Sequence, residues 1–306
     1  FHHIEFFCGN AKQSSYYYRM VFGFDVIAYR GPETGHPESV SYVLKQNQII
    51  FVLTSPIAEN KKIRNWLSSH GDGVCNIAIK VNDAFDAYHN SCKNGAIGVT
   101  EPFTLSDSDG SVSISSIAAY GDVVHTFVDD KSYNGVWMPG FEALSIDSNC
   151  YKSPDLLFID HIVANVEDKK MDKWKSFYEN VFGFSTFVKF DESDISTKYS
   201  SLKSVVVRSE NWKVKLPINE PAQGLKKSQI TEFLDFNNGP GVQHIAIQTE
   251  DIIGAIKSLR RNGVDFLEVP DTYYENLVDR IGNIQEDIEE LKKNKILVFP
   301  DWTYSH

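Results

Sequence analysis

Short apolar runs of strand type alternate along this chain with stretches of helical spacing. Between residues 167 and 181, apolar side chains recur every three or four positions, and Gly183 then ends the pattern. These side chains are Met171, Trp174, Phe177, Tyr178 and Val181. An aromatic stripe of this kind is typical of a helix that packs on a sheet. The pattern therefore predicts alternating strands and helices, with the helices covering a sheet.

The pattern occurs twice in the same order. A strand-like run at residues 1–7 leads into a helical stretch that ends in Val-Phe-Gly-Phe at 21–24. A run at residues 159–164 leads into a second helical stretch, which ends in the same four residues at 181–184. We expect each stretch to form the first strand and helix of one module.

A second pair of matching stretches follows in each half. Gly-Asp-Gly-Val-Cys-Asn-Ile-Ala-Ile at residues 71–79 corresponds to Gly-Pro-Gly-Val-Gln-His-Ile-Ala-Ile at 239–247. Each is followed by a short predicted helix, at residues 83–95 in the first half and at 251–263 in the second. Repeated matches in one order indicate two copies of one βαβ-type unit.

A histidine lies in each strand-like run of the second copy. His161 stands in Phe-Ile-Asp-His-Ile-Val-Ala-Asn, and His244 stands in Gly-Val-Gln-His-Ile-Ala-Ile. Because side chains alternate along a strand, such a histidine can face one side while its β-branched neighbours face the other. Two neighbouring strands would then present two imidazoles to one ion, which is half of a mononuclear metal site. We predict that His161 and His244 bind a metal.

The first copy differs at these positions. His3 corresponds to His161, but Asn76 stands where the second copy has His244. An amide is a poor ligand for a transition metal beside imidazole. A lone histidine on an apolar strand is more often a core residue, and we interpret His3 and His125 in that way. The first copy is therefore predicted to be structural and the second to carry the chemistry.

Composition narrows the class of protein. The 306 residues are 42% hydrophobic and 13% aromatic, which suffices for two cores at roughly 150 residues per domain. The formal net charge of −11 argues against binding to nucleic acid or to an anionic membrane. No apolar run approaches the ~18 residues of a membrane span. The four cysteines lack Cys-x-x-Cys spacing, so we expect a reducing, cytoplasmic location.

We divide the chain into two modules, at residues 1–149 and 150–306. The segment 141–155 between them is polar and aperiodic, as is typical of a linker. One further amphipathic helix is predicted beyond the second copy, packed on the second module and marked by Leu277, Ile281, Ile284, Ile288 and Leu291.

Six longer stretches are specific when taken together, and they span nearly all of the chain. They are Ala-Tyr-Arg-Gly at 28–31, His-Gly-Asp-Gly at 70–73, Tyr-Ser-Ser-Leu at 199–202, Leu-Pro-Ile-Asn-Glu-Pro-Ala at 216–222, Lys-Lys-Ser-Gln at 226–229 and Gly-Val-Gln-His-Ile-Ala at 241–246. In these stretches the chain resembles the 4-hydroxyphenylpyruvate dioxygenase family. The resemblance implies an α+β fold of two tandem vicinal oxygen chelate modules, each made of paired βαβββ units, with the second module incomplete.

The resemblance also implies a function and a site. It implies an Fe(II)-dependent dioxygenase of tyrosine and phenylalanine catabolism, which converts 4-hydroxyphenylpyruvate and O2 to homogentisate and CO2. His161 and His244 would be two ligands of Fe2+ in a homodimer or a higher homo-oligomer. The implied substrate pocket is lined by Ser204, Asn219, Gln229 and Gln243.

Residue chemistry fits a polar pocket, because amides and a hydroxyl can bind the phenol and carboxylate oxygens of a planar acid. On sequence alone, residues 217–221 fit an ordinary loop between two prolines equally well. Lys226 and Lys227 fit a solvated charge pair better than a substrate clamp.

The chain departs from the family after an apolar run at 296–298, which we predict to be a strand. The family carries a glutamate ligand well beyond this strand, whereas here the sequence continues only to His306. We therefore expect the third, carboxylate ligand beyond His306, and we expect the 306-residue chain to be inactive. Asp301 and His306 match no motif that would make them substitutes. The alternatives are a hydroxymandelate synthase-type oxygenase on the same substrate, or a truncated product that binds a ligand or partner without catalysis.

Overall fold

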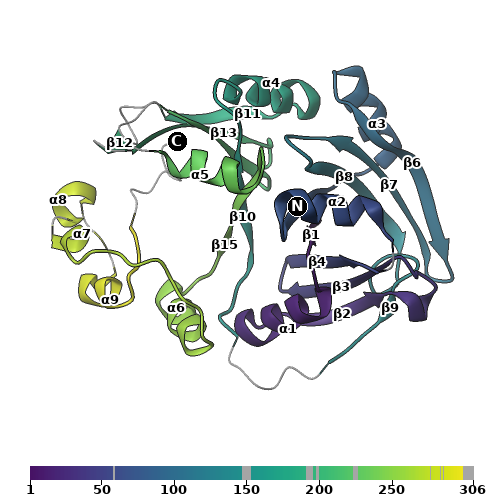
Figure 1. Ribbon diagram of the computed structural model, residues 1–306, viewed down its shortest axis with the longest axis horizontal. Helices are drawn as coiled ribbons and strands as arrows, with labels where there is room; N and C mark the ends of the chain where they lie inside the picture. The colour runs from purple at the N-terminus through teal and green to yellow at the C-terminus, as the bar shows by residue number, and fades with distance from the viewer. Residues whose placement is uncertain are drawn as a thin grey trace.

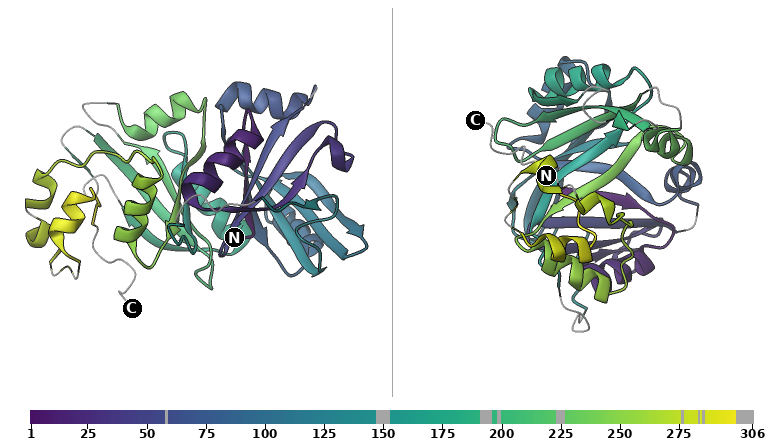
Figure 2. Two further views of the ribbon diagram at one scale, coloured as in Figure 1. Left: turned by 90° about the horizontal axis from the view of Figure 1, so that it is seen from below. Right: turned by 90° about the vertical axis from the view of Figure 1, so that its left-hand side faces the viewer.

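The computed structural model describes most of the chain, at residues 1–57, 59–146, 153–190, 196–197, 200–222, 227–275, 277–282, 284 and 286–298. These residues form two sheets with helices packed against them, in two modules that lie side by side (Figure 1, Figure 2). The predicted α+β class and the tandem arrangement are confirmed.

The first module consists of two βαβββ units in one nine-stranded sheet. Its first unit comprises β1 (His3–Phe7), α1 (Ala11–Phe22), β2 (Asp25–Arg30), η1 (Pro32–Thr34), β3 (Ser39–Gln46) and β4 (Ile49–Pro56), and α2 (Lys61–His70) follows. Its second unit comprises β5 (Gly73–Lys80), α3 (Ala84–Lys93), β6 (Gly98–Asp107), β7 (Gly110–Ala118) and β8 (Val124–Tyr133), and β9 (Glu142–Ala143) closes the module. The order β6-β7-β8-β5-β1-β4-β3-β2-β9 brings β5 and β1 together as antiparallel neighbours.

The second module repeats the β5-β1-β4-β3-β2 part of this order. Its elements are β10 (Phe158–Asn165), α4 (Met171–Phe182), β11 (Ser185–Phe190), β12 (Ser196–Thr197), β13 (Ser200–Arg208), β14 (Lys215–Pro221), α5 (Gln229–Phe236), β15 (Gly241–Gln248), α6 (Ile252–Arg261), α7 (Thr272–Glu275), α8 (Leu277–Ile281) and α9 (Ile288–Lys293). The path β11-β13-β14-β10-β15 corresponds to β2-β3-β4-β1-β5, and β12 pairs with β13. Helices α7 to α9 lie at the end of this module that is remote from the first module (Figure 2).

The predicted helices end where the sequence indicated. Gly23 after α1 and Gly183 after α4 adopt the left-handed conformation, with φ of 74° and 67°, which favours glycine at a helix C-terminus. Asp83 caps α3 by accepting from two backbone N–H groups, and Asp251 caps α6 by accepting from Gly254. The periodic pattern and the capping residues therefore agree.

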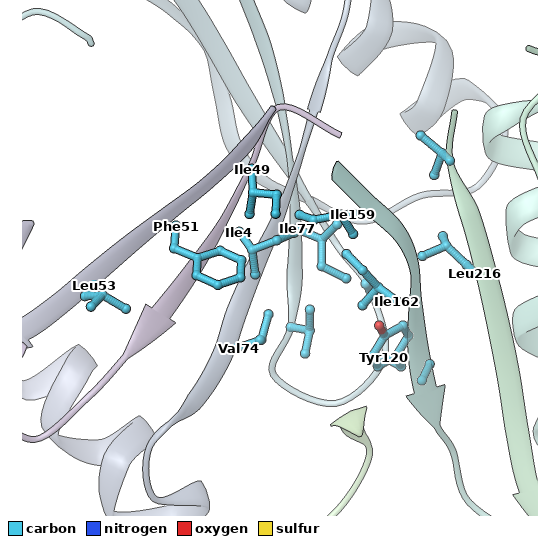
Figure 3. Packing of buried hydrophobic residues seen from close by; sticks show 14 of the residues in the cluster. Ile4, Ile49, Phe51, Leu53, Val74, Ile77, Tyr120, Ile159, Ile162 and Leu216 are labelled. Carbon is cyan, nitrogen blue, oxygen red and sulfur yellow. The ribbon is translucent and has the colours of Figure 1, made fainter. Parts of the chain in front are cut away.

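One hydrophobic core joins the two modules. Figure 3 shows Ile4, Phe51 and Ile77 of the first module gathered with Ile162 and Leu216 of the second. Each of these side chains is at most 3% exposed. Burial of such a side chain contributes about 1.5–3 kcal/mol, so the contact between the modules is a substantial source of stability.

The predicted linker is partly wrong. Residues 142–143 form β9, in which Ala143 pairs with Ala28 of β2, so the first sheet extends into the segment. The boundary predicted at residue 149 lies outside the described residues, as does Cys150. On the far side, the Ser153 hydroxyl contacts the Gln46 amide at 2.8 Å, so the start of the second module is attached to β3 of the first.

The single helix predicted over residues 277–291 is also wrong. Gly282, with a φ of 91°, follows α8, and Asp287 starts α9 by accepting from the Glu289 backbone N–H. The five apolar side chains nevertheless gather in one cluster, which also contains Ile253 of α6. The predicted packing on the second module is confirmed, although two short helices supply it.

Residues 296–298 do not form the predicted strand. The Tyr274 hydroxyl donates to the Ile296 carbonyl at 2.9 Å, and the Tyr273 hydroxyl bonds to both backbone groups of Val298. Side chains therefore satisfy backbone groups that a neighbouring strand would otherwise bind. In the part of the chain that the structure describes, the sheet of the second module ends at β15.

No helix among the described residues is long and apolar enough to cross a membrane. Cys8, Cys75 and Cys92 are free thiols, and the first two are buried.

Candidate functional site

Strand register brings His161 and His244 together. In the antiparallel pair β10–β15, His161 lies opposite Ala246 and Val163 lies opposite His244. The two histidines are therefore diagonal neighbours on one face of the sheet. Their ring centroids are 5.7 Å apart, and the rings meet edge to face at 73°. Since metal–nitrogen bonds are about 2 Å long, this separation suits two ligands of one ion.

A register shift accompanies each histidine. Asp160 is the extra residue of β10 between two paired positions, and Gln243 is the extra residue of β15. In a regular strand, the residue before a histidine faces the opposite side of the sheet, but a bulge can re-aim its side chain. Asp160 Oδ2 lies 2.7 Å from His161 Nδ1, and Gln243 Oε1 contacts His244 Nδ1.

These contacts determine which nitrogen can bind a metal. Carboxylate and amide oxygens accept hydrogen bonds, so Nδ1 of His161 and Nδ1 of His244 each carry the hydrogen. The Nε2 atom of each ring then keeps its lone pair for an ion, and the hydrogen bond on Nδ1 fixes the ring orientation. Both histidines are prepared as ligands in the same way.

The electrostatics favour the neutral, ligating form of His244. His244 is an exposed residue, but partial burial of its imidazole and the nearby His161 lower its pKa to about 4. Hydrogen bonds from His161 and from Lys215 lower the pKa of Asp160 to about 2. Lys215 Nζ lies 2.5 Å from Asp160 Oδ1. Near neutral pH, the ionised Asp160 carboxylate therefore accepts a hydrogen bond from Nδ1 of His161.

A group of polar side chains lies on the same face of the sheet. Ser204 of β13 pairs with Asn219 of β14, and Asn219 pairs with Asn165 of β10. Asn165 follows His161 at an even spacing along β10, so the two face the same side. Ser204 is 6% exposed and Asn165 is fully buried. The structure therefore brings the predicted residues Ser204 and Asn219 to the histidine face.

The loop interpretation of residues 217–221 is wrong, because these residues belong to β14. Asn219 Nδ2 donates to Asn165 Oδ1 at 3.4 Å. The Asn165 amide nitrogen is buried and has no hydrogen-bond partner within the described structure. A buried donor without a partner is costly, so it is available to a polar group of a ligand.

The other predicted pocket residues lie at the margin of this group. Gln229 is the first residue of α5 and is exposed, and α5 packs against β14 and β10. Gln243 is held against His244. Lys226 lies outside the described residues, whereas Lys227 forms a half-exposed ion pair with Asp235. The interpretation of Lys227 as a solvated charge is therefore supported.

Sequence reasoning missed Asp160, Lys215 and Asn165. Asp160 directly precedes His161, and Asn165 stands four positions after it, so alternation along the strand was a usable signal for Asn165. Asp160 would be predicted to face away, because a bulge leaves no clear mark in the sequence. Lys215 is recognisable only once β14 is placed beside β10.

Two strand histidines of the first module, His3 and His125, are buried. His3 is 6% exposed, contacts His2 Nδ1 at 2.7 Å and packs edge to face against Trp137, and burial lowers its pKa. His125 is fully buried, and its ring nitrogens contact the Ile77 carbonyl and the Tyr178 hydroxyl. Both environments agree with the core interpretation.

The described residues do not test the expected third, carboxylate ligand. Among the described residues, no group of three or more His, Cys, Asp or Glu side chains is arranged to hold a metal. Asp301 and His306 are not within the described residues. Two imidazoles whose Nδ1 atoms are already bonded nevertheless fit two positions of a non-haem Fe(II) site.

Two family models match the chain. The model described as "Hydroxyphenylpyruvate dioxygenase, HPPD, N-terminal" matches residues 1–138. The model of the glyoxalase, bleomycin resistance protein and dioxygenase superfamily matches residues 158–291. Each match falls within one of the two modules, and the second contains both candidate ligands.

Curated relatives match over nearly the whole chain. The 4-hydroxyphenylpyruvate dioxygenase of Dictyostelium discoideum is 45% identical over 97% of this chain and 84% of its own length. The enzyme of the same name from Danio rerio is 42% identical over 99% of this chain and 79% of its own length. A solved structure of a mutant 4-hydroxymandelate synthase from Streptomyces coelicolor has a TM-score of 0.81 at 23% identity, over 97% of this chain and 83% of that one. The last similarity concerns the fold alone.

Proposed function

The chain belongs to the 4-hydroxyphenylpyruvate dioxygenase family, and we propose that its second module converts 4-hydroxyphenylpyruvate and O2 to homogentisate and CO2. In this proposal, His161 and His244 are two protein ligands of Fe(II). The observation that carries it is the diagonal placement of the two rings, each with Nδ1 bonded to the preceding side chain. Bound iron would supply open coordination positions for the 2-oxo acid and O2.

The residues of this chain would bind and orient the substrate. Ser204 and Asn219 lie beside Asn165, whose amide nitrogen has no partner in the described structure. Such groups can accept from or donate to a phenol, and they share a face with the two histidines. We propose that these side chains hold the aromatic end of the substrate while its 2-oxo acid end lies near the metal. Fixed orientation of this kind supplies much of an enzyme's rate enhancement.

We assign Gln229 and Gln243 to the margin of the pocket. The contact between Gln243 and His244 supports a second role for Gln243, in holding the ring of that ligand. Hydroxylation of the side chain, as in a hydroxymandelate synthase, is not favoured, because the relatives with high identity carry the dioxygenase name.

Location and assembly are also part of the proposal. We propose a cytoplasmic enzyme, supported by three free thiols, Cys8, Cys75 and Cys92. We propose that it forms homodimers or higher homo-oligomers and does not bind nucleic acid, in line with its net charge of −11. We also propose the division into modules at residues 1–149 and 150–306.

The direct test is product analysis with Fe(II), ascorbate and 4-hydroxyphenylpyruvate, on this chain joined to a C-terminal segment that supplies the expected carboxylate ligand. We expect homogentisate and CO2 from the parent protein, and neither from His161→Ala or His244→Ala. The control is His89→Ala, since His89 is exposed on α3 of the first module. Formation of 4-hydroxymandelate as the main product, or undiminished turnover by both ligand variants, would overturn the proposal.

A further inference from the structure

The His-Gly-Asp-Gly stretch at residues 70–73 has no part in the site described above. His70 is the last residue of α2 in the first module, and its side chain is 5% exposed. The centroids of the Trp66 and His70 rings lie 4.8 Å apart, with the rings tilted by 53°. A buried histidine normally has partners for its polar nitrogens, so its contacts indicate what it does.

Both ring nitrogens of His70 contact oxygen atoms, and the two oxygens belong to different modules. Nδ1 lies 2.5 Å from the backbone carbonyl of Asn237, which ends α5 in the second module. Nε2 lies 2.8 Å from Oδ2 of Asp122, in the turn between β7 and β8 of the first module. His70 therefore connects the two modules.

The backbone carbonyl of Asn237 only accepts hydrogen bonds, so Nδ1 of His70 carries hydrogen and donates across the modules. Nε2 contacts the Asp122 carboxylate, whose side chain is 68% exposed. Asp72 is the other acidic side chain that lines the cavity beside His70, and it accepts from the Gly9 backbone N–H. The contacts thus place the imidazole between two acceptors, one in each module.

The turn that His70 contacts comprises residues 237–240, and it also touches the first module at Gly121. The Asn237 side-chain amide donates to the Gly239 and Pro240 carbonyls at 3.0 and 3.1 Å. A Cβ atom at Gly121 would lie 2.3 Å from the Pro240 carbonyl oxygen, so only glycine leaves room for the turn there. The Asn237 side chain therefore stabilises the turn through hydrogen bonds within it. His70 bonds to the turn from the first module, and Gly121 leaves room for it.

This turn connects the two elements that carry candidate functional residues. Helix α5 precedes the turn and has Gln229 as its first residue. Strand β15 follows the turn and contains Gln243 and His244. We propose that His70 is a positioning residue of the first module, a latch on the 237–240 turn that holds β15 and its metal ligand in place. This inference rests on the proposed function, because it takes His244 as a ligand.

Variants at His70 separate the two hydrogen bonds. Asparagine places an amide donor near the position of Nδ1, so His70→Asn retains the link to Asn237 across the modules. Glutamine places a donor near the position of Nε2, so His70→Gln retains the bond to Asp122 only. His70→Ala removes both, and His89→Gln is the matched control on exposed α3 of the first module. Ile63→Val in α2, where Ile63 is 5% exposed, controls for simple destabilisation of that helix.

The readout is the visible spectrum and affinity of Co(II) bound to the full chain, because the spectrum reports ligand geometry and needs no turnover. We expect His70→Ala and His70→Gln to change the spectrum and weaken Co(II) binding by on the order of tenfold, as loss of an outer support of a ligand does. His70→Asn should restore most of the affinity. His89→Gln and Ile63→Val should match the parent spectrum, even where Ile63→Val lowers the melting temperature.

Nitrogen NMR of the labelled parent protein tests the hydrogen bond to Asn237 without any variant, which matters if His70→Ala fails to fold. We expect Nδ1 of His70 to carry hydrogen, because its partner is a carbonyl oxygen. An Nδ1 atom without hydrogen, or a Co(II) spectrum like that of the parent in His70→Ala and His70→Gln, overturns the latch. An unchanged Co(II) spectrum in His244→Ala would instead overturn the metal site itself, so the two failures can be told apart.

Discussion

The two modules contain the same strand pair in the same register, with different chemistry. In the first module, His3 lies opposite Ala78 and Glu5 lies opposite Asn76. In the second, His161 lies opposite Ala246, and Val163 lies opposite His244. The neighbouring strands correspond as well, since the pair Ser41 and Thr54 holds the place of Ser204 and Asn219.

The polar groups of the first module bind one another. The Thr54 hydroxyl donates to Glu5 at 2.9 Å and contacts Ser41, while the Asn76 amide donates to Glu5. His3 is bonded to His2 and packed against Trp137. In the second module, Val163 replaces the carboxylate, and the histidine Nε2 atoms and the Asn165 amide are left for a ligand. The equivalent face of the sheet is therefore filled by its own side chains in the first module, whereas in the second it offers groups that can bind a ligand.

The largest expected effect is on iron content, which histidine variants of the second module should lose and the His3 variant of the first should keep. His161→Ala or His244→Ala should abolish iron retention and turnover, because each removes a protein ligand. His3→Ala should retain the iron content of the parent, since its ring is bonded within the first module. Metal analysis after gel filtration measures this. Equal iron loss from the His3 variant would reverse the assignment of the two modules.

The buried His125 predicts how pH affects stability. Burial lowers the pKa of His125 to about 4, whereas an unfolded histidine titrates near 6.5. Between these values the unfolded chain binds a proton that the folded chain does not, so stability falls as pH falls. The loss is about 3 kcal/mol by pH 4, at 1.36 kcal/mol per pH unit.

Chemical denaturation of the parent and of His125→Phe across this pH range isolates that contribution. The variant should lose less stability than the parent as the pH is lowered from 6.5 to 4. Its loss of the hydrogen bond to Tyr178 shifts both ends of the range equally. Parallel curves for the two proteins would show that His125 is not buried in its neutral form.

The hydrogen bond between Asp160 and His161 predicts that metal affinity falls in steps as Asp160 is altered. Asp160→Asn keeps an oxygen acceptor but removes the charge, and Asp160→Leu removes both. Loss of such a partner costs about 10–100-fold in metal affinity, so Asp160→Leu should be the weaker binder of the two. Equilibrium dialysis with Fe(II) under anaerobic conditions measures it. Parent affinity in Asp160→Leu would remove Asp160 from this role.

The smallest effect compares matched positions in the two sheets. Asn219→Ala should lower kcat/KM, because polar contacts to the substrate are lost or left unsatisfied. The loss should correspond to about 1–3 kcal/mol of transition-state binding energy, with the iron content unchanged. Its counterpart Thr54→Ala should leave kcat/KM unchanged and affect stability only, because Thr54 is occupied by Glu5. Unchanged kinetics in Asn219→Ala would take Asn219 out of the pocket.

The duplication and the histidine pair could be predicted because both leave periodic, repeated marks in the sequence. Strand alternation placed His161 and His244 on one face, and glycines at 23 and 183 marked helix ends. The bulges at Asp160 and Gln243 could not be predicted, because an extra residue in a strand is defined by its partner strand. The break at Gly282 was hidden because the apolar spacing continues across it and one cluster still collects those side chains.

Anomalous diffraction at the iron edge tests the central comparison most directly. Crystals of the chain joined to a C-terminal segment with the expected carboxylate ligand, grown anaerobically with Fe(II), should show one peak, about 2 Å from Nε2 of His161 and from Nε2 of His244. No peak should lie beside His3 and Asn76. A peak at the first-module pair, or a peak bound through the Nδ1 atoms, would contradict the account.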